Sequence, residues 1–206
     1  MRFHMKNNLS IAVLLVASSF TSIAYASTVE KDKTVDYLQF RNGVVYQVNH
    51  TDAYTGTFLS KYSNGQNKLT VKFTKGQPVG VSTRWYPSGQ KEKVVNYADG
   101  VKAGQVTTWY PNGQKSSEVT YKEGSVDGNL TEWYSNGQVS EKTAFTNDVR
   151  NGQSTMWYDN GQKSYAANFK EGKKVGDLTE WSETGHKYLS TTYKNGNLVA
   201  RTEWFN

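Results

Sequence analysis

The chain has 206 residues, a formal charge of +6 at neutral pH and 14% aromatic residues. Cysteine is absent, which excludes disulfide frameworks and cysteine-containing metal sites. A hydrophobic content of 36% is low for a thick two-layer core, yet the many aromatic residues argue against a disordered chain. We therefore expect an ordered but thin structure.

The first 26 residues have the pattern of a cleaved secretory signal peptide. Arg2 and Lys6 form a basic start, residues 9–16 are apolar, and a small-x-small cleavage motif ends at Ala26. Polar residues then interrupt the apolar run, which leaves it shorter than the roughly 20 residues of a membrane-spanning helix. We expect cleavage after Ala26 and a periplasmic or secreted protein without a transmembrane segment, a retained anchor being the alternative. Cleavage would lower the formal charge from +6 to +4.

Glycine and aromatic residues recur every 24 residues in the rest of the chain. The consensus is G-x-x-T-x-W-Y-x-N-G-Q-K-x5-Y-x-x-G-x3. Six full copies cover residues 56–199, and a partial seventh covers 200–206. A fixed period of this length is typical of repeat arrays, in which each unit is one supersecondary element.

Each repeat is predicted to be a β-hairpin, because a β-rich half ending in Trp-Tyr is followed by Asn-Gly and a second alternating half. Pro87 and Gly89 favour a three-residue loop with glycine in the left-handed position, and a two-residue primed turn is the alternative. A loop of odd length predicts that Trp85 shares a face with Val95 and Tyr97. No helical period of useful length occurs in the mature chain. The predicted fold class is all-β, an elongated antiparallel meander of stacked 24-residue hairpins in a single-layer twisted sheet.

Two sets of recurring residues are assigned structural roles. A lone hairpin cannot bury enough surface to offset the entropy of ordering it, so each tryptophan is expected to pack on the neighbouring copy. The turn glycines supply the positive φ that the loop needs. The structural residues are Trp85, Trp109, Trp133, Trp157, Trp181, Gly89, Gly113, Gly137 and Gly161.

The residue inventory does not favour an enzyme. His50 and His186 stand in no pattern that supplies a metal site or a base beside a nucleophile. Glu132 and Glu180 are expected to lie roughly 19 Å apart, beyond the roughly 5 to 9.5 Å used by glycosidases. We therefore expect no catalytic residue, no metal site and no cofactor.

A column of tyrosines is the predicted partner-binding surface. An aromatic stripe beside lysines, on the face opposite the tryptophans, has the chemistry of a binding surface, although stacking along the array is the alternative. Basic and acidic residues are interleaved without a dense basic stripe, so nucleic acid is not an expected partner. The candidate residues are Tyr62, Tyr86, Tyr110, Tyr134, Tyr158, Lys91, Lys115 and Lys163.

The W-Y-x-N-G-Q-K units resemble the MORN (membrane occupation and recognition nexus) repeat, a β-hairpin with a Y-x-N-G-x turn. They most resemble the bacterial MORN variant class known as YwqK-type antitoxin repeats. Residues 38–56 are similar to the hairpin that precedes such arrays, which implies that residues 27–55 form a leader with an N-terminal capping hairpin. Departures occur at both ends, with Lys61 at the first tryptophan position and Ser182 at the last tyrosine position. The resemblance implies a non-enzymatic scaffold that binds another protein, and an antitoxin's partner would have to be periplasmic or secreted.

The W-Y-x-N-G pattern is also similar to the choline- and glucan-binding repeats of bacterial surface proteins. Those repeats are shorter and usually carry a Gly-Trp pair that this chain lacks. No polybasic cluster or amphipathic helix points to a lipid surface. We therefore expect an unidentified protein partner, with an envelope glycan or lipid as the alternative.

Overall fold

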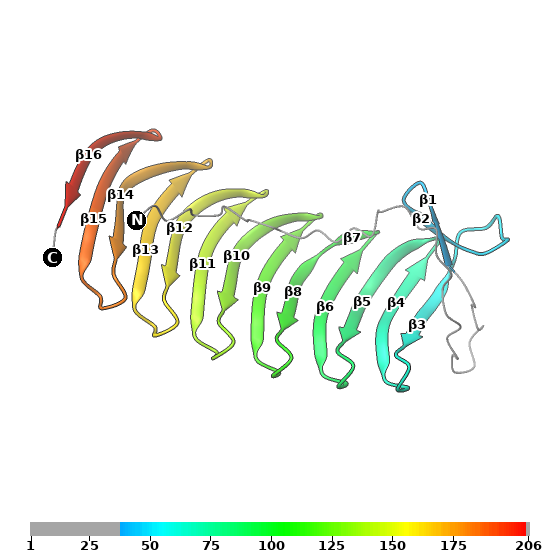
Figure 1. The fold of residues 1–206 in the computed structure, drawn as a ribbon. Helices are drawn as coiled ribbons and strands as arrows, with labels where there is room; N and C mark the ends of the chain where they lie inside the picture. The colour runs from blue at the N-terminus through cyan, green and yellow to red at the C-terminus, as the bar shows by residue number, and fades with distance from the viewer. Residues whose placement is uncertain (1–37, 205–206) are drawn as a thin grey trace.

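The computed structural model describes residues 38–204, which form a curved row of antiparallel hairpins (Figure 1). The predicted signal peptide, residues 1–26, lies outside the described residues. The strands in this part of the chain are β1 (Leu38–Arg41), β2 (Val44–Gln47), β3 (Gly56–Lys61), β4 (Asn67–Thr74), β5 (Gln77–Trp85), β6 (Lys91–Ala98), β7 (Val101–Lys102), β8 (Gly104–Trp109), β9 (Lys115–Lys122), β10 (Ser125–Trp133), β11 (Val139–Thr146), β12 (Val149–Trp157), β13 (Lys163–Lys170), β14 (Lys173–Trp181), β15 (Lys187–Lys194) and β16 (Asn197–Glu203).

One open sheet contains all the strands from β3 to β16. Strands that follow one another in sequence pair antiparallel, except that the short β7 pairs only with β6 and β8 continues the sheet beside β6. This confirms the predicted all-β meander of 24-residue hairpins. No helix long and apolar enough to cross a membrane is present between residues 38 and 204.

The β1–β2 hairpin forms a separate two-stranded sheet at the N-terminal end of the row. It lies within the predicted leader, residues 27–55. The Val45 N–H donates to the carbonyl oxygen of Gly76 at 3.0 Å, and the Tyr54 N–H donates to the carbonyl oxygen of Val45 at 2.8 Å. One backbone hydrogen bond therefore attaches the hairpin to the turn between β4 and β5, and the other attaches it to Tyr54, just before β3.

The predicted three-residue loop is confirmed at the Trp-Tyr end of the hairpins. The Tyr86 N–H donates to the Gln90 carbonyl at 2.8 Å, and the Gly89 N–H donates back to the Tyr86 carbonyl at 2.9 Å. Gly89 has a φ of +88°, a conformation that L side chains rarely adopt. The same pair of hydrogen bonds closes every later loop through Gly185.

The predicted pairing of faces is wrong beyond the loop. Trp85 lies opposite Lys91, as a three-residue loop requires, but the register then shifts, so that Ser82 lies opposite Val95. A β-bulge, with one extra residue in the second strand, causes this shift. Val95 and Tyr97 therefore lie on the face opposite that of Trp85. The same shift occurs beside Trp109, Trp133, Trp157 and Trp181.

The hydrophobic core lies along the face that carries Val95, which we call the core face. Its side chains form two clusters that follow the row of hairpins rather than a single central core. Thr143 and Ser154 are fully buried there, and their hydroxyls form a hydrogen bond of 2.7 Å between β11 and β12. The clusters contain Val95, Val106, Tyr121, Val126 and Phe145, and then Ala167, Phe169 and Leu178.

The opposite ends of the strands are joined by two-residue turns. Both turn residues have positive φ, as at Glu123 (+50°) and Gly124 (+87°), which is the type I′ geometry that suits the twist of a hairpin. Asp148 takes the glycine position in one turn, with a φ of +64°. Its backbone N–H donates to the Val126 carbonyl at 2.9 Å, and its carboxylate accepts from the Val126 N–H at 2.7 Å. The glycines of the other turns form the same backbone bond, so the bond to the carboxylate is what an aspartate adds at this position.

Candidate partner-binding surface

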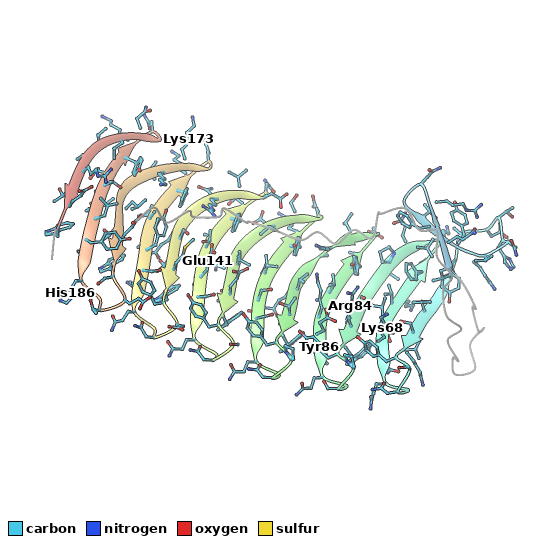
Figure 2. The ribbon with its side chains drawn as sticks, viewed as in Figure 1. Lys68, Arg84, Tyr86, Glu141, Lys173 and His186 are labelled. Atoms are coloured by element: carbon cyan, nitrogen blue, oxygen red, sulfur yellow. The ribbon has the colours of Figure 1, made fainter. Side chains whose placement is uncertain are left out.

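The five predicted partner-binding tyrosines form a ladder at the rim of the sheet, where Tyr86 is labelled in Figure 2. Each hydroxyl donates to the carbonyl oxygen of the tryptophan in the next repeat, at 2.7 to 2.8 Å. Their rings are partly buried. The ladder therefore joins successive hairpins. The pairs are Tyr62 with Trp85, Tyr86 with Trp109, Tyr110 with Trp133, Tyr134 with Trp157 and Tyr158 with Trp181.

Burial raises the pKa of three of these tyrosines, Tyr86, Tyr134 and Tyr158. Desolvation is the largest cause that raises the pKa of Tyr134, and the nearby Asp159 carboxylate and the neighbouring Tyr158 and Tyr110 raise it further. A neutral hydroxyl is what the hydrogen bond to the next carbonyl requires. The surroundings of these three tyrosines therefore favour the neutral, hydrogen-bonded form.

The Asn-Gly-Gln loops form a second ladder beside the tyrosines. The Asn112 side chain donates to the Ser135 carbonyl at 2.7 Å and accepts from the Gln114 N–H at 3.1 Å. The Gln114 side chain in turn packs over Gly137, where an added Cβ would lie 2.9 Å from its Oε1 atom. The turn glycines thus provide space for the preceding repeat as well as a positive φ. Ser88 replaces the asparagine in one loop, which removes this link there.

The tryptophans lie on the face opposite the core. Trp157 follows Gln153 and Thr155 on the same face of β12, whereas the buried Ser154 between them points to the core face. All five predicted structural tryptophans are partly buried rather than buried. They therefore contribute less to the hydrophobic core than the valine, phenylalanine and tyrosine residues of the core face.

Lysines alternate with these tryptophans across the sheet. In each hairpin the residue opposite the tryptophan is a lysine, except in one, where Val139 lies opposite Trp133. The Nζ atom of Lys115 lies 5.6 Å from the centre of the Trp133 ring, so this cation also contacts the next repeat. We call this set the Trp–Lys row. Its pairs are Trp85 with Lys91, Trp109 with Lys115, Trp157 with Lys163 and Trp181 with Lys187, and it also contains Trp133.

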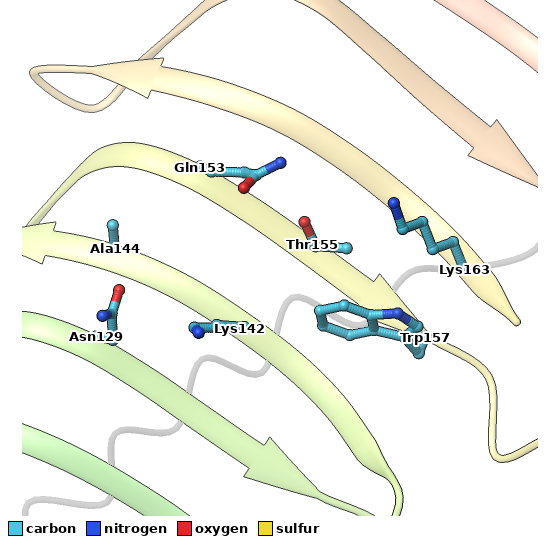
Figure 3. Close-up of a pocket in the computed structure, with 7 residues that line it drawn as sticks. All are labelled: Asn129, Lys142, Ala144, Gln153, Thr155, Trp157 and Lys163. Carbon is cyan, nitrogen blue, oxygen red and sulfur yellow. The ribbon is translucent and has the colours of Figure 1, made fainter. Parts of the chain in front are cut away.

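A shallow hollow of about 270 Å³ opens on the row at Trp157. Figure 3 shows the Trp157 indole between Lys142 on β11 and Lys163 on β13, with Thr155 and Gln153 beside it on β12. The hollow thus combines an aromatic ring, two cations and polar side chains. Of the predicted binding residues, the structure places Lys91, Lys115 and Lys163 opposite tryptophans rather than together with the tyrosine hydroxyls.

A pair of carboxylates lies on the core face and was missed by sequence reasoning. Glu132 and Glu141 lie directly opposite each other on β10 and β11. Burial is the largest cause that raises the pKa of Glu132, and the Glu141 carboxylate raises it further. The Thr143 hydroxyl donates to Glu141 at 2.7 Å. The pair does not line the hollow, which opens on the other face.

His50 and His186 have ordinary surroundings. The His186 ring lies in the last loop, with its Nδ1 atom 2.9 Å from the Thr184 hydroxyl, and the His50 N–H donates to the Gln47 carbonyl at 3.1 Å. Across residues 38–204, no group of three or more His, Asp or Glu side chains is placed to hold a metal ion.

Comparison with known proteins assigns the repeats to a family. Four consecutive segments match the model of the MORN repeat variant, residues 78–99, 102–123, 126–147 and 150–171. The first and last of the six repeats, which carry Lys61 and Ser182, are not among the matched segments. A search of curated proteins found no match to the chain. MORN repeats are in general non-catalytic modules that bind proteins or lipids. Four consecutive repeats between residues 78 and 171 are therefore similar to the MORN repeat variant.

Proposed function

We propose that the chain is an exported, non-enzymatic repeat scaffold that binds another protein, and that the partner docks on the Trp–Lys row. The observation that carries this proposal is the alternation of partly buried tryptophans and exposed lysines along one face of the sheet. Partly exposed aromatic rings and cations at fixed spacing provide both apolar area to bury and charge recognition. Affinity would be summed over several repeats, because each repeat offers a similar contact.

The tyrosine ladder supports the proposal indirectly. Its hydroxyls are engaged in hydrogen bonds to the next repeat, which leaves their rings, rather than their polar ends, to meet a partner. These hydrogen bonds stiffen the array and fix the spacing of the neighbouring tryptophans. Lys91, Lys115 and Lys163 lie opposite tryptophans and therefore belong to the Trp–Lys row, not to the ladder.

Export follows from the predicted signal peptide, and with it the location of the partner. A basic start, an apolar stretch and a small-x-small motif ending at Ala26 predict release into the periplasm or beyond. If the chain acts as an antitoxin, as the resemblance to YwqK-type repeats implies, the neutralised protein would be periplasmic or secreted. Fractionation of the native host, with detection of the mature chain, tests this part of the proposal separately.

Crosslinking in the native host tests the docking surface. We expect the wild-type chain to capture a defined protein, and a Lys115→Gln/Lys163→Gln variant to lose most of that capture. A Lys122→Gln/Lys170→Gln variant is the matched control, because it removes the same charge from exposed lysines outside the row. Equal capture by the two variants would show that the row is not the docking surface. Sedimentation of the chain with purified envelope material, without a captured protein, would favour a glycan or lipid partner instead.

A further inference from the structure

We propose that the Trp–Lys row binds an extended, acidic, proline-rich segment of the partner protein in the polyproline II conformation, with one acidic residue per turn. This inference rests on the proposed protein-binding function and specifies the chemistry of the partner.

Spacing is the first argument. Consecutive tryptophans of the row lie two strands apart, which corresponds to about 9.6 Å at ~4.8 Å per strand. A polyproline II helix has three residues per turn and a rise of ~3.1 Å, which gives a repeat of about 9.3 Å. The mismatch is about 0.3 Å per repeat, or about 1.2 Å over the four intervals of the row. A rigid ligand of this type can therefore stay in step with all five tryptophans.

Other regular peptide conformations fit the spacing less well. Side chains on one face of a β-strand repeat every ~6.7 Å, which brings no equivalent side chain to successive tryptophans. A helix with a heptad repeat advances ~10.5 Å per seven residues, so it would be about 3.6 Å out of step after four intervals. The polyproline II repeat is thus the one that matches the row over its full length.

The indole groups supply the second argument. In the part of the chain that the structure describes, the five indole N–H groups of the row form no intramolecular hydrogen bond, and none of them is sealed from solvent. A polyproline II segment has no internal hydrogen bonds, so its carbonyl oxygens point outward and need donors. Tryptophan presents a ring face to proline and an N–H to a carbonyl at the same time, which is how aromatic grooves recognise proline-rich segments.

Charge supplies the third argument, and it sets the acidic character of the ligand. Lys91, Lys115, Lys163 and Lys187 lie opposite four of the five tryptophans, so cations share the spacing of the aromatic rings. Lys115 forms a surface ion pair with Glu118. A ligand carboxylate can take the place of Glu118 at little cost in free energy, because such pairs contribute little to stability. One carboxylate per turn of the ligand would meet these lysines in register. Lys142, at the hollow beside Trp157, adds a further cation.

Peptide binding to the purified mature chain tests the inference. The probes are fluorescent (Glu-Pro-Pro)5, the charge-reversed (Lys-Pro-Pro)5 and a (Glu-Pro-Pro-Pro)4 peptide whose charge period is wrong. We expect the first to bind at least tenfold more tightly than either control, as measured by fluorescence anisotropy at low and at physiological salt. Equal binding of (Glu-Pro-Pro)5 and (Glu-Pro-Pro-Pro)4 would overturn the argument from spacing.

Variants of the row then separate its two components. Trp109→Phe/Trp157→Phe keeps an aromatic ring and removes two indole donors, and we expect at least a tenfold loss of (Glu-Pro-Pro)5 binding, with Trp204→Phe, outside the row, as the control. Val139→Lys fills the gap in the cations, and we expect tighter binding by about two- to fivefold. Unchanged affinity in both row variants would refute the inference. If the tryptophan variant fails to fold, Lys163→Gln/Lys187→Gln replaces it, because both lysines are exposed. We expect this variant to bind (Glu-Pro-Pro)5 more weakly than the wild type, and unchanged affinity would again refute the inference.

The outcomes distinguish the inference from the function on which it rests. If the row lysines are needed for capture in the host but (Glu-Pro-Pro)5 does not bind, the partner is a protein of another chemistry. The inference then fails, whereas the proposed function stands. If a soluble polyuronate binds more tightly than the peptide and competes with it, the row is a site for acidic glycans. If neither capture nor peptide binding depends on the row, both the function and the inference fail.

Discussion

Removal of one hydroxyl from the tyrosine ladder should measure how strongly adjacent hairpins are joined. In Tyr134→Phe the ring keeps its contacts, but the 2.7 Å hydrogen bond to the Trp157 carbonyl is lost. A hydrogen bond of this kind contributes about 1 kcal/mol net to stability. Tyr134→Ser also removes a partly buried ring, whose burial of up to about 150 Å² adds at most about 4 kcal/mol at ~25 cal/mol/Å². We therefore expect losses of about 1 and at most about 5 kcal/mol.

Urea unfolding followed by far-ultraviolet circular dichroism measures both losses. Tyr97→Phe is the matched control, because its hydroxyl has no hydrogen-bond partner among residues 38–204 and its removal should cost almost nothing. Tyr86 and Tyr134 lie four strands apart, about 19 Å, so the double Phe variant should lose about 2 kcal/mol by simple addition. A Tyr134→Phe loss no larger than that of Tyr97→Phe would show that the ladder does not hold the repeats together.

Three further changes test other parts of the array. Ser88→Asn should restore the missing loop link and raise stability by about 1 kcal/mol in the same urea assay, whereas Ser88→Ala should not. Gly137→Ala and Gly65→Ala should cost the same to within about 0.5 kcal/mol, because both glycines have similar positive φ and the added Cβ at 137 meets only the flexible end of the exposed Gln114 side chain; a much larger loss at 137 would show that the glutamine is held rigidly. Burial raises the pKa of Tyr165 to about 12, so its contribution to stability is complete below the unfolded value near 10 and is lost as the pH rises through the folded value. Urea unfolding at pH 9 to 12 should therefore show a smaller decline in Tyr165→Phe than in the wild type.

The 24-residue period was sufficient to predict the repeats, the three-residue loops and the antiparallel sheet. Periodic glycines and Trp-Tyr-x-Asn-Gly segments specify turns through local backbone geometry, which sequence reveals directly. The register beyond the loop was not predictable in this way. The extra residue beside Trp85 changes which side chains share a face, and the sequence carries no mark of the bulge that distinguishes it from a regular strand.

That single shift also accounts for the missed features of the candidate surface. With regular pairing, Trp85 would share a face with Val95, so tryptophan was expected in the core and tyrosine on the exposed face. The bulge instead places tryptophan opposite the core, where Lys91 lies across from it. It also pairs Glu132 with Glu141, whereas sequence reasoning compared Glu132 with Glu180. Equal-parity counting from the loop gave the wrong face for Val95, and the comparison of Glu132 with Glu180 followed the repeat period without considering partners within one hairpin.

The ladders at the rims have a genetic consequence. Tyrosine and asparagine side chains donate hydrogen bonds to the backbone carbonyl of the residue 23 positions later. A backbone hydrogen bond such as that from the Gly172 N–H to the Arg150 carbonyl joins residues 22 positions apart. Excision of any complete 24-residue module would therefore place every donor beside an equivalent acceptor, and a tandem duplication would do the same. In-frame recombination between repeats can thus lengthen or shorten the row of hairpins by about 9.6 Å at a time without creating a new interface between hairpins.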